Sequence, residues 1–236
     1  MMQRWDSRAA AKALSYYGIN FISGAPLMLD ELADAAARLG VSSNVRLGLS
    51  GGAPLRPETQ DKYVRAVGPP VQFYGMTESW VLTYQPLTVK DVKGTVGAPI
   101  ADVDVKVVNP DSPSEERSVG EVGELLAKAP WLTEGYEDPQ ETDRAFYQGW
   151  LRTGDLMAID DRGLLYFRGV RKRMINYKAY PIFPKDLEVI LMRHEAVRQA
   201  YVYGEPDPEV GERPVAKVVL KPGKGSGFHR GSANPL

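Results

Sequence analysis

The order of apolar runs and helix-like stretches in the first third of the chain limits its fold more than any other feature of the sequence. Short apolar runs at 21–24, 46–50 and 71–75 alternate with helix-like stretches at 5–17, 27–38 and 57–66. Apolar strands separated by helices are typical of a parallel sheet with helices on its faces. We therefore predict an incomplete parallel α/β layer that extends to about residue 90.

Two changes of pattern follow. Strands are predicted at 102–109 and 120–129, and a hairpin at 156–169 turns at 160–163, which indicates an antiparallel β region. A helix at about 184–194 and strands at 200–205 and 214–222 then predict a small α+β lobe. The expected fold class is thus α/β and α+β. We expect one domain at 1–169, a second at 170–222 and an unstructured tail at 223–236.

Composition excludes several classes of function. The chain of 236 residues has 29 basic and 30 acidic residues, so its charge gives no support for nucleic-acid or anionic-membrane binding. It has no cysteine and only two histidines, which argues against thiolate chemistry, a histidine triad and a zinc site. No apolar run is long enough to cross a bilayer, and the start has no signal core, so we expect a cytoplasmic protein.

The strongest local motif is QFYGMTES at 72–79, where an apolar strand meets a glycine, a hydroxyl and a carboxylate. Thr77 and Glu78 at such a turn are suited to a phosphate and its magnesium ion, because Mg²⁺ favours one or two carboxylates together with phosphate oxygens. Amide groups at a helix start would add to such a site. The alternative is a glycine turn at Gly75 followed by an N-capping Thr77, and the motif alone favours that alternative.

Two further motifs carry polar or small residues after strands. Asp155 in GWLRTGDL (149–156) can accept both hydroxyls of a ribose, and the alternative is an aspartate that closes a β-turn. Gly51-Gly52-Ala53-Pro54 lets the backbone lie flat against a ring, and the alternative is a simple strand–helix loop. The basic run 171–173 is, on charge alone, a solvated linker.

The order of these motifs points to a known family. SGGAPL (50–55), YGMTES (74–79), GWLRTGDL (149–156) and the stretch 164–188 resemble the ANL superfamily of adenylate-forming enzymes, most of all its fatty-acid and aryl-acid CoA ligases. The resemblance implies a two-step reaction of a small carboxylic acid. ATP and Mg²⁺ serve the first step, which gives an acyl-adenylate, and coenzyme A serves the second, which gives the thioester.

The resemblance also implies roles for individual residues. Thr77 contacts the α-phosphate, Glu78 holds magnesium and Asp155 binds the ribose hydroxyls. Residues that surround the adenine or ribose are Gly52, Ala53, Pro54, Gln72, Tyr74 and Arg171, where Tyr74 stacks on the ring and Arg171 replaces an arginine that the family has at Val170. The loop 177–180 faces the pantetheine arm. We expect Tyr74, Thr77, Glu78 and Asp155 to converge on one cleft.

The sequence also departs from the family. The phosphate loop belongs upstream of these residues and the catalytic lysine beyond them, and we interpret Lys221 and Lys224 as surface residues. Arg173 and Ala179 replace the usual hinge residue and a glycine near coenzyme A. We therefore expect a ligase fragment that is inactive alone and that associates with a complementary N-terminal half or with itself. Alternatives are a non-catalytic nucleotide-binding or interaction protein and a truncation product without function.

Overall fold

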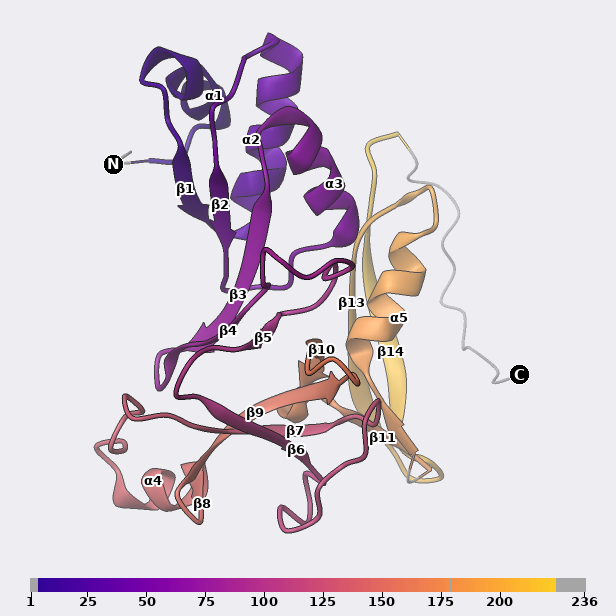
Figure 1. Cartoon of the computed structure of the whole chain (residues 1–236). Coiled ribbons are helices and arrows are strands. Elements are labelled where there is room, and N and C mark those ends of the chain that lie inside the picture. Colours follow the sequence, from indigo (N-terminus) through magenta and orange to yellow (C-terminus); the bar gives the residue numbers. More distant parts are fainter. Residues whose placement is uncertain (1–3, 179, 224–236) are drawn as a thin grey trace. The chain divides into compact units, whose positions relative to one another are not determined.

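The computed structural model describes residues 4–178 and 180–223 (Figure 1). The chain divides into two compact units, Met1–Phe167 and Arg168–Leu236. Among the residues that the structure describes, the first unit contains two sheets and four helices, and the second contains one sheet with a single α-helix.

A mixed sheet begins the first unit. Its strands lie in the order β1-β2-β3-β4-β5 and span Phe21–Gly24, Leu47–Ser50, Pro70–Met76, Trp80–Tyr84 and Ala98–Pro99. Strands β1, β2 and β3 pair in parallel, whereas β4 and β5 pair antiparallel. The predicted parallel layer is therefore confirmed for three strands. The sequence pattern did not predict β4 or β5, which extend the same sheet beyond residue 90.

Three helices accompany this sheet, α1 (Ser7–Tyr16), α2 (Pro26–Leu39) and α3 (Pro57–Ala66). The Asp6 carboxylate caps α1 by accepting from the amides of Arg8 and Ala9 at 2.9 Å. Proline begins α2 and α3, and Gly40 ends α2 in the left-handed conformation. These start and stop signals are why the helices agree with the predicted ranges to within two residues.

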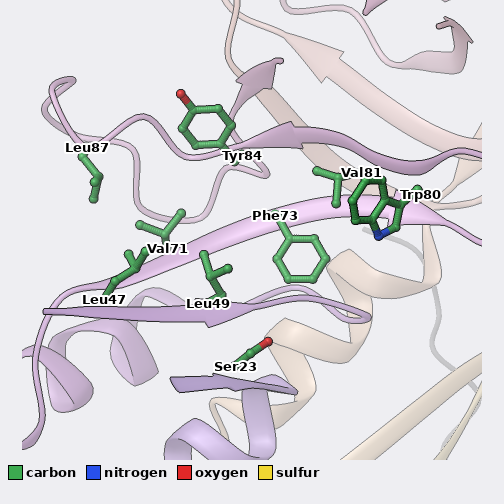
Figure 2. Close-up of a pocket in the computed structure, with 9 residues that line it drawn as sticks. All are labelled: Ser23, Leu47, Leu49, Val71, Phe73, Trp80, Val81, Tyr84 and Leu87. Atoms are coloured by element: carbon green, nitrogen blue, oxygen red, sulfur yellow. The ribbon is translucent and has the colours of Figure 1, made fainter. Parts of the chain in front are cut away.

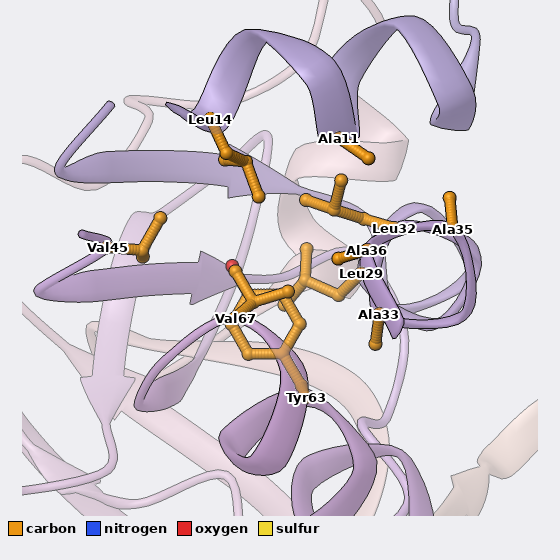
Figure 3. Packing of buried hydrophobic residues seen from close by; sticks show 10 residues of the cluster. All are labelled: Ala11, Leu14, Leu29, Leu32, Ala33, Ala35, Ala36, Val45, Tyr63 and Val67. Carbon is orange, nitrogen blue, oxygen red and sulfur yellow. The ribbon is translucent and has the colours of Figure 1, made fainter. Parts of the chain in front are cut away.

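The helices form the main core of the unit with one face of the sheet (Figure 3). Leu14, Leu29, Leu32 and Tyr63 are fully buried there. A Cβ atom at Gly48 would lie 2.7 Å from the Tyr63 hydroxyl, so glycine lets α3 approach β2. Because side chains alternate along a strand, Leu47 and Leu49 of β2 point away from these helices.

The second sheet of this unit has the order β10-β9-β7-β6, and β8 also pairs with β9. Its strands β6 to β10 span Asp104–Val108, Gly123–Lys128, Phe146–Tyr147, Trp150–Ile159 and Leu165–Val170. The pairs β6–β7, β7–β9 and β8–β9 are antiparallel, which confirms the predicted antiparallel region. Helix α4 (Pro139–Ala145) was not predicted, because none of its residues is buried and it therefore has no apolar period.

The two sheets of the first unit contact each other around Tyr74 of β3. Its side chain packs against a cluster formed by Val96, Val107, Leu125, Met157 and Leu165, and against a second cluster formed by Leu82, Val103 and Ala127. The amide of Leu165 donates to the carbonyl of Gly97 at 2.8 Å. Residues separated widely in sequence are thus fixed near the end of β3.

The second unit is a small α+β structure, as predicted. Its strands lie in the order β12-β11-β14-β13, with bounds Tyr180–Ile182, Ile175–Tyr177, Gly211–Leu220 and Val197–Asp207. A short 3-10 helix, η1 (Arg171–Arg173), precedes them, and helix α5 spans Pro184–Met192. Arg173 pairs with buried Glu188 at 2.5 Å and donates to the Val202 carbonyl at 3.1 Å, which connects η1, α5 and β13. Apart from Gly223, the predicted tail lies outside the described residues.

Candidate functional site

The turn after β3 carries the polar residues of the strongest sequence motif. A Cβ atom at Gly75 would lie 1.6 Å from the Trp80 carbonyl oxygen, so glycine permits the close approach of β3 and β4. Residues 77–79 form a tight turn into β4 rather than the start of a helix. The idea that Thr77 caps a helix is therefore wrong, and it is Ser79 whose hydroxyl accepts from the Met76 amide at 3.3 Å.

Tyr74 and Asp155 are in direct contact, although 81 positions separate them in sequence. The Tyr74 hydroxyl donates to Asp155 Oδ2 at 2.8 Å. The Asp155 amide donates to Thr153 Oγ1 at 3.1 Å, and the Thr153 hydroxyl donates to the Leu125 carbonyl at 2.8 Å. Gly154 has a φ of 70° between them, a conformation that favours glycine. Strand β9 thus presents the carboxylate to β3.

Burial sets the protonation of this pair. Burial, with a contribution from the Asp155 charge, raises the pKa of the Tyr74 hydroxyl well above its ordinary value. Burial also raises the pKa of Asp155 above 3.8, although the hydrogen bond from Tyr74 acts in the opposite direction. Tyr74 therefore remains a hydrogen-bond donor, and its partner is a half-buried carboxylate. Asp155 Oδ1 makes no hydrogen bond within the described part of the chain.

Gln72 connects β3 with the glycine-rich loop. Its Oε1 accepts from the Leu55 amide at 2.7 Å, and its Nε2 donates to the Ala53 carbonyl at 3.1 Å. Gln72 is buried, whereas Gly52, Ala53 and Pro54 are exposed. A Cβ atom at Gly51 would lie 2.3 Å from the Phe73 ring. Glycine at position 51 thus leaves room for the Phe73 ring, and the contact of the loop with a nucleotide ring remains a prediction.

Glu78 is held by a loop that the sequence analysis missed. The Tyr136 hydroxyl donates to Glu78 Oε1 at 2.7 Å, and the Thr133 amide donates to the Glu78 carbonyl at 2.8 Å. Trp131 Nε1 donates to the Ser79 carbonyl at 3.0 Å. The hydrogen bond to Glu78 raises the pKa of Tyr136 to about 12. The sequence signal was the aromatic pair Trp131 and Tyr136, placed between a strand and a proline.

The structure brings only some of the predicted site residues together. Tyr74 contacts Asp155, and exposed Thr77 and half-buried Glu78 follow on the turn at the end of β3. That all four open onto one cleft remains a prediction. Arg171 lies in the second unit, so its role at a ribose also remains a prediction, and Ala179 lies outside the described residues. Residues 4–178 and 180–223 contain no cluster of three His, Cys, Asp or Glu that would hold a metal.

An apolar pocket opens on the face of the first sheet that carries Leu47 and Leu49 (Figure 2). Its volume is about 500 Å³, and it is lined by Ser23, Leu47, Leu49, Val71, Phe73, Trp80, Val81, Tyr84 and Leu87. Trp80 is 77% exposed and has a φ of 52°, which is unusual for a bulky residue. This face of the sheet is therefore apolar and open within the first unit.

Comparison with known families identifies this architecture. A sequence profile described as "AMP-binding enzyme" matches residues 1–137, more than half of the chain. The chain belongs to the AMP-binding enzyme family. A second profile, "AMP-binding enzyme C-terminal domain", matches residues 186–231. The resemblance to adenylate-forming enzymes that the motifs indicated is thus confirmed.

Individual relatives agree with this assignment. The chain is 36% identical over 232 residues to "4-coumarate--CoA ligase-like 6" of Oryza sativa, which covers 94% of this chain and 38% of that protein. It resembles ATP-bound MatB from Rhodopseudomonas palustris with a TM-score of 0.85 at 27% identity, covering 94% of this chain and 44% of the other. A structure of MenE from Bacillus subtilis with ATP and magnesium gives a TM-score of 0.81 at 28% identity, covering 93% and 45%. The chain therefore spans less than half the length of these relatives. Among the described residues, no helix is both long enough and apolar enough to cross a membrane.

Proposed function

We propose that this chain supplies the adenosine-binding part of an AMP-forming acyl-CoA synthetase. In the first step, a carboxylate oxygen attacks the α-phosphorus of ATP, and the bond to the pyrophosphate oxygen breaks. In the second step, the thiol sulfur of coenzyme A attacks the acyl carbon, AMP leaves, and the thiol proton passes to solvent. The observation that carries the proposal is the contact between Tyr74 and Asp155, supported by the CoA ligases among the relatives.

The geometry fits a nucleoside on the pair Tyr74 and Asp155. Tyr74 engages only Oδ2 of Asp155, so Oδ1 is available to accept from ribose hydroxyls. The exposed loop 52–54 would border the adenine, beside the ring of Tyr74. Gln72 would act on the adenine edge through this loop, because both of its amide atoms already bind residues 53–55. The Thr77 hydroxyl would point toward the α-phosphate.

The same turn fits magnesium bound together with a nucleotide. Tyr136 occupies Oε1 of Glu78, and Oε2 makes no hydrogen bond within the described residues. One carboxylate is too few for a closed protein site, but Mg²⁺ commonly uses one or two carboxylates plus phosphate oxygens. When bound, the ion neutralises phosphate charge. Glu78 would hold the ion, and Thr77 would remain free for the phosphate.

The remaining assignments follow from the family. We propose that 1–169 is the second half of a large AMP-binding domain and that 170–222 belongs to its small C-terminal domain. Arg171 would reach the ribose, and the loop 177–180 would face the pantetheine arm of coenzyme A. The substrate would be a small carboxylic acid, and a cytoplasmic location remains a prediction.

The open apolar face of the first sheet is suited to binding a protein partner. Trp80, Tyr84 and Leu87 are 77%, 45% and 69% exposed there, and large apolar patches of this kind often mark interfaces. The relatives contain further polypeptide that this chain does not span. We therefore propose that a complementary N-terminal half covers this face. Sedimentation of the chain with such a half added tests whether the two associate. Sedimentation of the chain alone would reveal self-association.

Two assays test the proposed function. Calorimetry with AMP should detect binding, and a chain that binds no AMP would contradict the proposal. Acid-dependent pyrophosphate release by residues 1–236 alone should remain at background. The reason is that loss of one preorganised donor costs about 10²–10³ in rate, and this stretch has neither the phosphate loop nor the lysine. Robust turnover by these residues alone would contradict the expected inactivity. AMP binding that remains without turnover after a complementary half is supplied would favour a non-catalytic nucleotide-binding protein.

A further inference from the structure

We propose that Tyr136 is a positioning residue that orients the Glu78 carboxylate for the magnesium ion of a bound nucleotide. The inference rests on the proposed function, because it assumes that Glu78 meets that ion. It adds a residue to which neither the sequence motifs nor the family resemblance gave a role. Two sets of contacts carry it, those between Tyr136 and Glu78 and those that hold Tyr136 in place.

The loop 131–136 donates three hydrogen bonds to the turn that carries Glu78. Trp131 Nε1 donates to the Ser79 carbonyl at 3.0 Å, and the Thr133 amide donates to the Glu78 carbonyl at 2.8 Å. These two contacts fix the backbone of the turn. The third contact, from the Tyr136 hydroxyl to Glu78 Oε1 at 2.7 Å, fixes the carboxylate itself.

The backbone of Tyr136 is clamped to helix α4. Its amide donates to Thr142 Oγ1 at 2.8 Å, and the Thr142 hydroxyl lies 3.3 Å from the Tyr136 carbonyl oxygen. A Cβ atom at Gly135 would lie 2.6 Å from two atoms of the Thr142 side chain, and Gly135 has a φ of 151°. Glycine is therefore needed for this approach. Asp138 caps α4 by accepting from the Gln140 amide at 2.8 Å, which fixes the helix that presents Thr142.

This arrangement suits a carboxylate that binds a metal. A hydroxyl that donates to an ionised carboxylate makes a strong hydrogen bond, and here it leaves Oε2 as the oxygen available to a cation. A half-buried glutamate without such a partner would sample several rotamers and would lose that freedom on binding. Groups that orient metal ligands typically change metal affinity by about 10–100-fold when they are removed. Removal of the Tyr136 hydroxyl should therefore weaken Mg²⁺ binding and leave the adenosine contacts unchanged.

The test measures ATP and AMP binding to the full 236-residue chain by calorimetry, with and without Mg²⁺. Tyr136→Phe should reduce the Mg²⁺-dependent gain in ATP affinity by about 10-fold or more. Its AMP affinity without Mg²⁺ should equal that of the parent. Tyr147→Phe is the matched control, because this half-buried tyrosine follows the same helix and its hydroxyl makes no hydrogen bond within the described residues. Glu78→Gln should lose the gain with Tyr136 still present.

Each outcome decides a different point. A parent chain that binds AMP but gains nothing from Mg²⁺ would overturn the assignment of magnesium to Glu78, and the positioning role with it. A parent that gains while Tyr136→Phe gains equally would overturn the positioning role alone. If Tyr136→Phe also weakened AMP binding without Mg²⁺, Tyr136 would merely support the fold of the site. A second variant, Thr142→Val, keeps Tyr136 but removes the hydroxyl that accepts from the Tyr136 amide. It should reduce the Mg²⁺-dependent gain in ATP affinity to a smaller extent than Tyr136→Phe.

Discussion

The two ends of the proposed nucleotide site are built differently. The pair Tyr74 and Asp155 connects two sheets, packs against two apolar clusters and is fixed by the fold of the first unit. The turn with Thr77 and Glu78 is partly or fully exposed and depends on a few hydrogen bonds from one loop. Changes at the first end should therefore affect the stability of the fold, and those that remove the Asp155 carboxylate should weaken binding as well. Changes at the second end should affect binding while the fold is kept.

The largest effect on stability is expected at Gly75, which lies in β3 between Tyr74 and the turn that carries Thr77 and Glu78. Gly75→Ala would place a Cβ atom 1.6 Å from the Trp80 carbonyl oxygen, so β3 and β4 must move apart. We expect a loss of about 3 kcal/mol or more in urea unfolding. Gly204→Ala is the control, because its Cβ would meet only the Glu212 side chain, with Oε1 nearest at 3.1 Å, and no backbone atom at such short range. Equal stability of the two variants would contradict the close approach of the strands.

A matched pair of tyrosine substitutions tests the comparison directly. Tyr74→Phe leaves a half-buried carboxylate without its donor and should cost about 1–2 kcal/mol. Tyr136→Phe removes a hydrogen bond at an exposed site and should cost less than about 0.5 kcal/mol. Urea unfolding monitored by circular dichroism gives both values. If Tyr136→Phe were the more destabilising of the two, the distinction between the two ends would be wrong.

The smallest effect concerns pH. The pKa of Asp155 is raised in the folded chain, so the folded state binds more protons, and the contribution of Asp155 to stability falls as pH rises from 3.8 through the folded-state pKa. Asp155→Asn keeps an acceptor for Tyr74 but carries no charge. Its stability relative to the parent should therefore increase between the ordinary pKa of 3.8 and neutral pH. Unfolding at several pH values measures this, and a decrease over that range would contradict the direction of the shift.

Local signals explain which parts of the fold the sequence could predict. Helices α1 to α3 have caps, an N-terminal proline or a terminal glycine together with a clear apolar face, and their positions were predicted. Strand β4 follows a turn that depends on the approach of Gly75 to Trp80, and helix α4 has no buried residue. Neither element has an apolar period of its own. Tertiary contacts decide them, so the pattern did not show them.

The site was predictable to a similar extent. The family resemblance pointed to Tyr74 and Asp155, and the structure shows their contact, which spacing alone could not give across 81 positions. The hydrogen bonds of Gln72 to residues 53–55 and of Tyr136 to Glu78 were not accessible, because each depends on where a distant loop lies in space. Both side chains support their neighbours, and a motif rarely reveals such support.

The most direct test of the nucleoside site compares Asp155→Ala with Tyr74→Phe in AMP calorimetry. Both variants break the hydrogen bond between these residues, but only the first removes the carboxylate. If Asp155 accepts the ribose hydroxyls, Asp155→Ala should lose roughly 1.5–3 kcal/mol of binding free energy. Tyr74→Phe keeps both the carboxylate and a ring for the adenine, so it should bind AMP within a few-fold of the parent. Unchanged AMP affinity in Asp155→Ala, or an equal loss in the two variants, would contradict the assignment.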